Sequence, residues 1–129
     1  TRTVVVGKAS EEQKKVYDTV KRAQQTGLDA IRAGILGAEA DKAARDVIAA
    51  AGYGAYFGHS LGHGVGLLIH ELPNLSPGSK VRLAEGMIVT CEPGIYIPDF
   101  GGVRIEDMVC VREGGIENLT HLSKDLLEL

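Results

Sequence analysis

Three of the four histidines in this 129-residue chain fall within 12 residues, in a segment rich in glycine. They are His59, His63 and His70. Two glutamates, Glu92 and Glu106, follow in runs whose composition is typical of β-strands. Imidazole together with several carboxylates is a ligand set of hydrolytic metal sites. These five residues are therefore the first candidates for chemistry.

The spacing of the histidines indicates how the chain presents them. His59 and His63 are four residues apart, which on a helix would place both rings on one face. Glycines on both sides disfavour a helix, so we expect the backbone to pass close to another segment and each ring to be oriented separately. A single histidine is usually an ordinary core or surface residue, but three in one segment favour a function.

The two glutamates differ in how strongly they indicate a site. Glu92 follows the apolar run Met87–Val89 and precedes Pro93, which favours an extended backbone at Glu92. A carboxylate at the end of a buried strand is costly unless it is paired or bound to a metal. Glu106 shares one face of an expected strand with Arg104, and that pair is equally compatible with a solvated, salt-bridged face.

Composition narrows the class of protein. The length allows one domain with a real core, and the net charge of −3 gives no reason to expect a nucleic acid or an anionic membrane as partner. No apolar run approaches the roughly 18 residues that span a bilayer. Cys91 and Cys110 do not form a disulfide framework and are expected to be small buried hydrophobes. We therefore expect a cytoplasmic protein, and the opening Thr1-Arg2-Thr3, without methionine, indicates part of a longer chain.

Periodicity predicts the elements that carry these residues. Ser10 and Gln13 fit a capping box at the start of a helix whose apolar stripe runs to Ile31, and Gly52 is placed to end a second helix. Pro73 lies in an expected loop. The predicted second helix spans residues 38–51. The predicted strands span residues 1–6, 86–92, 94–97 and 103–112. This order predicts an α+β fold with helices on one face of a largely antiparallel sheet.

Three motifs together resemble the pita-bread metallopeptidases, a family that includes prolidase, Xaa-Pro aminopeptidase and methionine aminopeptidase. The motifs run from His59 to Glu71, from Glu92 to Gly94 and from Gly102 to Asp107. The third is similar to the Xaa-Pro branch of the family. The resemblance implies part of a pita-bread (creatinase/aminopeptidase) fold, in which two helices pack on a curved, largely antiparallel sheet. It leaves open whether the protein is a dipeptidase or an aminopeptidase.

The resemblance also implies a role for each candidate residue. The family site holds two divalent metal ions, such as Mn, Co, Fe or Zn, through two aspartates, one histidine and two glutamates. His63, Glu92 and Glu106 match metal ligands, and Glu92 also matches the general base towards the attacking water. His59 and His70 match histidines that bind the substrate and stabilise or protonate the intermediate, and Arg104 matches a supporting arginine.

The two aspartates of the family site have no counterpart in this sequence. We therefore expect residues 1–129 to be the C-terminal portion of a catalytic domain, with its N-terminal half and N-terminal domain absent. Such a piece would bind at most one metal weakly and be inactive alone. The implied partners are a proline-containing peptide and, in the parent, a second copy; the edge at residues 1–6 would let the piece self-associate.

Two other functions fit the same fold. A metal-free module that binds peptides or proteins is one, and a creatinase-like hydrolase with histidine acid-base chemistry is the other. Retention of His63, Glu92 and Glu106 argues against both, because neither needs all three ligands.

Overall fold

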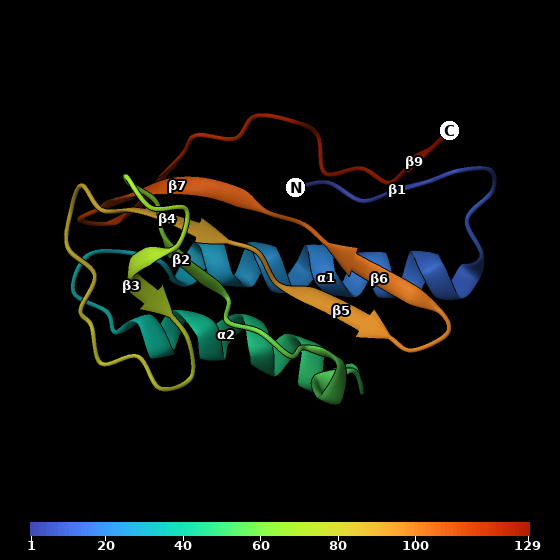
Figure 1. Cartoon of the computed structure of the whole chain (residues 1–129), viewed down its shortest axis with the longest axis horizontal. Helices are drawn as coiled ribbons and strands as arrows, with labels where there is room; N and C mark the ends of the chain where they lie inside the picture. Colours follow the sequence, from blue (N-terminus) through green and yellow to red (C-terminus); the bar gives the residue numbers. More distant parts are fainter.

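The computed structural model describes all residues from 1 to 129 and shows the expected α+β arrangement. Helices α1 and α2 lie side by side, and the strands cover one side of them (Figure 1). The elements are β1 Val4–Val5, α1 Glu11–Ala30, α2 Gly37–Ala50, the 3-10 helix η1 Gly54–Tyr56, β2 Gly62–Gly64, β3 Glu71–Leu75, β4 Ile88–Cys91, β5 Gly94–Ile97, β6 Gly101–Arg104, β7 Asp107–Arg112, β8 Gly115–Asn118 and β9 Leu127–Glu128.

Both helices begin and end within a residue of where their local signals predict. Ser10 caps α1: its hydroxyl accepts from the Gln13 amide, and the Gln13 side chain accepts from the Ser10 amide. Gly52 has a φ of +88°, the left-handed conformation that favours glycine after a helix. The predicted apolar stripe of α1 is buried in the core, as are three apolar residues of α2: Val16, Val20, Ala23, Leu28, Ile31, Ala40, Ala44 and Ile48.

The main sheet has five antiparallel strands in the order β3-β2-β4-β7-β8. A separate hairpin joins β5 to β6. Cys91 on β4 packs against Gly27 of α1, where an added Cβ would lie 3.0 Å from the Cys91 sulfur. This close approach joins α1 to the strand that precedes Glu92, and both cysteines are buried as predicted.

The predicted single strand at 103–112 is wrong. Its first part, β6, pairs with β5, whereas β7 pairs with β4 in the other sheet. The break falls at Ile105 and Glu106, and Ile105 is fully buried. Strands β2, β3, β8 and β9 were not predicted, and β3 contains Pro73, which we expected in a loop. Since β3 is the edge strand of the sheet, a residue without an N–H is tolerated there.

The expected free edge at the start of the chain is also wrong. Only Val4–Val5 forms a strand, and it pairs in parallel with β9. On the other side, the Glu106 amide donates to the Thr1 carbonyl, and the Thr3 hydroxyl donates to the Arg104 carbonyl. Both sides of this segment therefore have partners in the chain. Self-association of the chain stays a prediction, but it no longer has a free strand edge at residues 1–6 to support it.

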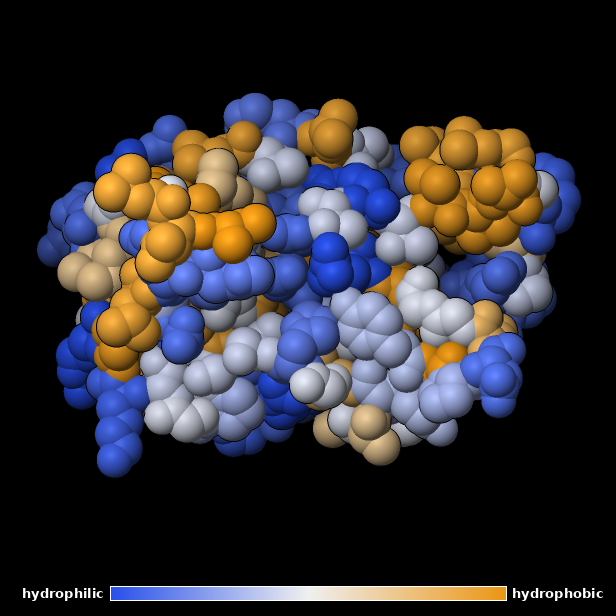
Figure 2. Space-filling view, in the orientation of Figure 1, coloured by the Kyte–Doolittle hydropathy of each residue, from blue (hydrophilic) through white to orange (hydrophobic).

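Two apolar areas remain on the surface. Figure 2 shows one over the loop between β2 and β3 and another towards the β1 and β9 end. The exposed residues of the loop region are Leu67, Leu68, Ile69 and Leu72. Neither helix is long and apolar enough to cross a membrane.

Candidate metal centre and substrate pocket

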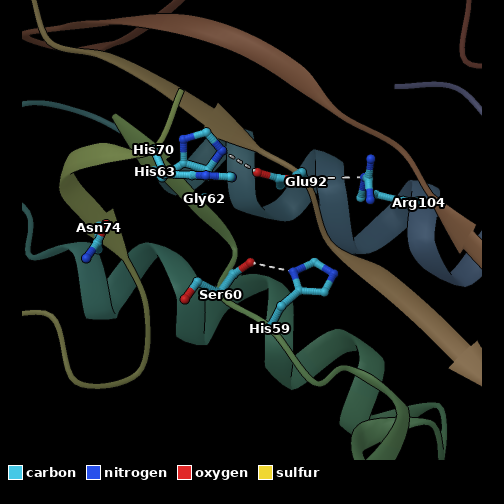
Figure 3. A pocket seen from close by; sticks show the side chains of 8 residues that line it. All are labelled: His59, Ser60, Gly62, His63, His70, Asn74, Glu92 and Arg104. Atoms are coloured by element: carbon cyan, nitrogen blue, oxygen red, sulfur yellow. Dashed lines mark hydrogen bonds and ion pairs between the residues drawn. The ribbon is translucent and has the colours of Figure 1, made fainter. Parts of the chain in front are cut away.

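A polar pocket of about 330 Å³ gathers nearly all the residues that the sequence singled out. The eight residues that line it include no hydrophobic one, and they come from separate parts of the fold (Figure 3). They are His59, Ser60, Gly62, His63, His70, Asn74, Glu92 and Arg104. Of the candidate site residues, only Glu106 lies outside this lining.

His63 and Glu92 face each other across the pocket. The His63 Nε2 atom lies 2.9 Å from Glu92 Oε1, and both side chains are mostly buried. Thr90 joins them a second time, since its hydroxyl accepts from the His63 amide and donates to Glu92 Oε1. The neighbouring Gly62 allows this, because an added Cβ would overlap the Thr90 carbonyl. Strands β2 and β4 thus fix the pair through their close approach.

The proton on the other ring nitrogen of His63, Nδ1, determines what can bind between His63 and Glu92. Nδ1 lies 3.0 Å from the Gly64 carbonyl, an acceptor, so Nδ1 carries a proton. In a neutral ring, Nε2 then presents a lone pair to the carboxylate of Glu92. Two lone-pair atoms at this separation need a positive charge, which a proton or a metal ion supplies. Imidazole and carboxylate are the donor types of a divalent metal site, so this pair fits such an ion in kind.

Arg104 lies between the two glutamates. Its Nε atom is 3.7 Å from Glu92 and 3.9 Å from Glu106, and it is buried without a hydrogen-bond partner. The Glu106 carboxylate also accepts from the Thr1 hydroxyl. Burial alone would raise the pKa of Glu106, but the Thr1 hydroxyl, the ammonium at the start of the chain and Arg104 together outweigh burial and hold that pKa below its ordinary value. Glu106 is thus an ionised carboxylate beside the pocket.

The three predicted ligands do not meet at one point. Glu106 turns towards Thr1, and no group of three or more His, Cys, Asp or Glu side chains is placed to hold a metal ion. What the chain presents is a two-residue donor set, His63 and Glu92, with a second carboxylate on the far side of Arg104.

His59 and His70 occupy different parts of the pocket. His59 Nε2 is 3.0 Å from the Tyr96 hydroxyl, and its Nδ1 is 2.8 Å from the Ser60 carbonyl. His70 lies on the exposed loop before β3, with its ring 4.4 Å from that of His63. His59 is therefore held by two partners, whereas His70 is anchored only by ring contact with His63.

Sequence reasoning missed Asn74, which lines the pocket from β3, and three residues that contact side chains of the site. Tyr96 lies on β5, where alternation with the buried Ile95 turns it outward towards His59. That alternation was a usable signal. Thr90 and Thr1 gave none, because their roles depend on contacts with residues 27 and 105 positions away.

Known proteins resemble this chain closely. The model of metallopeptidase family M24 matches residues 1–113. The Bacillus subtilis peptidase YqhT is 53% identical over 129 residues, and the Xaa-Pro dipeptidase of Pyrococcus furiosus is 50% identical over 127 residues. These alignments cover 100% and 98% of this chain but only 36% of each relative.

A solved structure agrees in fold. The Xaa-Pro dipeptidase from Bacillus anthracis superposes with a TM-score of 0.98 at 52% sequence identity, over 99% of this chain and 36% of that one. This chain therefore spans about a third of the length of its relatives. Since the family match extends over most of the sequence and the pita-bread fold is shared, the chain belongs to metallopeptidase family M24.

Proposed function

We propose that residues 1–129 form the C-terminal portion of the catalytic domain of an Xaa-Pro peptidase, which hydrolyses the peptide bond before proline. One observation carries this proposal: His59, His63, His70, Glu92 and Arg104, from separate segments, line one polar pocket. The relatives supply the substrate class, since two of those described above are Xaa-Pro dipeptidases. Because the chain spans 36% of them, the activity belongs to the longer protein.

The metal would be held by His63 and Glu92, with Glu106 as a further ligand. A divalent ion such as manganese would polarise the scissile carbonyl and acidify a water molecule. Two such ions carry four positive charges, and Glu92 and Glu106 supply two negative ones. We therefore propose that the dinuclear site needs carboxylates beyond this chain, and that residues 1–129 alone bind at most one ion.

The other proposed roles concern the reaction and the support of the ligands. The family resemblance gives Glu92 the additional role of general base towards the attacking water, and its Oε1 accepts from Thr90 and lies beside His63. His59, held by the Tyr96 hydroxyl, and His70 bind the peptide and donate protons to it. Arg104 keeps the two glutamates in place through its contacts with both.

Compartment and assembly complete the proposal. Both cysteines are buried and free, which supports a reducing, cytoplasmic environment. Besides the proline-containing peptide, the proposed partner of the longer protein is a second copy, as a homodimer.

Calorimetric titration with Mn²⁺ tests the roles of the histidines. We expect the 129-residue chain to bind one equivalent weakly and no second one, His63→Ala to lose that binding, and His70→Ala to keep it. His121→Ala is the matched control, since His121 is exposed and does not line the pocket. Loss of binding in His70→Ala but not in His63→Ala would contradict the assignment.

Activity assays separate this proposal from a metal-free module and from a creatinase-like hydrolase. In a full-length enzyme that contains this chain, His70→Ala should lower turnover of an Xaa-Pro dipeptide by about 10²- to 10⁴-fold. Chelation should abolish turnover, and the 129-residue chain alone should show none. Chelator-sensitive cleavage by the chain alone would refute its proposed inactivity, and activity that survives chelation would favour the creatinase type.

A further inference from the structure

An ion pair on helix α2 lies outside the pocket and still contacts the segment that carries the pocket histidines. Asp41 and Arg45 are four residues apart on α2, and their side chains pair through two bonds. Arg45 Nε donates to Asp41 Oδ2 at 2.7 Å, and Nη2 donates to Oδ1 at 2.9 Å. The Asp41 side chain is 1% exposed and the Arg45 side chain is 26% exposed, so the carboxylate is buried and the guanidinium is partly buried.

The same two side chains also form hydrogen bonds with backbone groups of residues 57–61. Arg45 donates to the Phe57 carbonyl at 2.9 Å and to the His59 carbonyl at 2.8 Å. Asp41 Oδ1 accepts from the Leu61 amide at 3.0 Å. Residues 57–61 have no regular secondary structure, so these groups have no strand or helix partners. One ion pair thus fixes three backbone points within five residues.

The backbone segment held in this way includes the pocket residue His59 and contacts another, Glu92. The Leu61 carbonyl accepts from the Glu92 amide at 2.7 Å, and Leu61 itself is fully buried. The Arg45 guanidinium lies 4.1 Å from the centre of the Phe57 ring, which in turn contacts the His59 ring edge-on at 5.1 Å. The pair therefore reaches His59 from one side and Glu92 from the other.

A neighbouring pair shows that this is not a general property of α2. Lys42 and Asp46 have the same spacing on the same helix, but both side chains are more than half exposed. Their only hydrogen bond is to each other. Exposed pairs of this kind contribute little to stability.

We propose that Asp41 and Arg45 are positioning residues, which hold the His59 backbone and, through Leu61, the Glu92 backbone at the spacing that the pocket requires. The catalytic meaning of this inference rests on the proposed function, but the positioning itself does not. Arginine is suited to the task because its planar fork can bind a carboxylate and two carbonyls at once.

Amide hydrogen exchange of the 129-residue chain, followed by NMR, tests the positioning. In Arg45→Met, the Leu61 and Glu92 amides should exchange about tenfold faster or more, as expected when a buried hydrogen bond loses its support. In Lys42→Met, the matched control, they should stay within about twofold of the wild type. The Val109 amide in β7 should not change in either variant. Arg45→Lys keeps the positive charge but not the planar guanidinium, and should give the same increase in the exchange rate of the Leu61 amide.

Two results would overturn the inference. Equal exchange rates in the Arg45→Met and Lys42→Met variants would show that the pair positions nothing. An equal increase at Leu61 and Val109 in both Arg45 variants would show that the pair only stabilises the whole fold. If Arg45→Met does not fold, Arg45→Lys carries the same comparison.

Titration with Mn²⁺ on the same samples links the positioning to the site. Arg45→Met should weaken Mn²⁺ binding by about tenfold, the lower range for residues that orient metal ligands, and Lys42→Met should not. A wild-type chain that binds no Mn²⁺ would contradict the proposed function and not the exchange result. Unchanged Mn²⁺ affinity in Arg45→Met would overturn the link between the pair and the site.

Discussion

Replacing Gly62 with alanine should separate strands β2 and β4 and break hydrogen bonds that hold His63 and Glu92 in the pocket. An added Cβ would lie 2.8 Å from the Thr90 carbonyl carbon, 3.1 Å from its Oγ1 and closer still to its carbonyl oxygen. These are atoms of a central strand, so they cannot move aside as the end of a flexible side chain would. The strands would have to separate by about 1 Å, as in an overpacked core.

The cost follows from the contacts that this separation breaks. Overpacking alone costs about 1–3 kcal/mol, and each hydrogen bond lost adds about 1 kcal/mol. Two bonds are at risk, from the Glu92 amide to the Leu61 carbonyl and from the His63 amide to the Thr90 hydroxyl. We therefore expect Gly62→Ala to lower the free energy of unfolding by about 3–5 kcal/mol.

Urea denaturation monitored by circular dichroism measures this change, with Gly58→Ala as the matched control. Gly58 precedes Gly62 in the same segment, has no atom within 4 Å of an added Cβ and has no positive φ. Alanine there should be neutral or stabilise by about 0.4–1 kcal/mol. Unfolding free energies of the two variants within about 1 kcal/mol of each other would refute the reasoning.

Two further predictions concern stability. Ser10→Ala should cost about 1 kcal/mol through loss of the α1 cap, and thermal unfolding checks this; an unchanged melting temperature would contradict it. Burial alone would raise the pKa of Asp107, but hydrogen bonds from Lys124, Asn118 and Arg2 outweigh burial and lower the pKa to about 2. Because the folded pKa lies below the unfolded one, this carboxylate stabilises the fold above about pH 4, and the stabilisation is lost as the pH falls towards 2. The stability advantage of the wild type over Asp107→Asn should therefore shrink by about 2 kcal/mol between pH 5 and pH 2, and a constant difference in urea denaturation would contradict this.

The helices show how far local signals reach. The start of α1 depends on Ser10 and Gln13, which lie three residues apart, and the end of α2 depends on the backbone of Gly52 alone. Such interactions close within one turn of the chain, so a sequence pattern predicts them without knowledge of the fold. The same holds for the period of the buried stripe in α1.

The strands show where local signals fail. Alternation across 103–112 predicted one strand, because side chains alternate in the same way on either side of a break. The strand is interrupted because its two parts pair with different strands: β6 pairs with β5, and β7 pairs with β4. Asp107 illustrates the consequence, since it is fully buried and paired with Arg2 and Lys124 from the two ends of the chain.

The sequence by itself determined the two helices, the α+β class and the identity of the candidate residues, because these depend on residue type and on spacing within a turn or a strand. Only the tertiary structure decided that His63 meets Glu92, that Glu106 turns to Thr1 and that Asp41 and Arg45 hold the histidine segment. The physical reason is distance along the chain. Buried polar groups must find partners, and for these residues the partners are supplied by segments that come together only when the core packs.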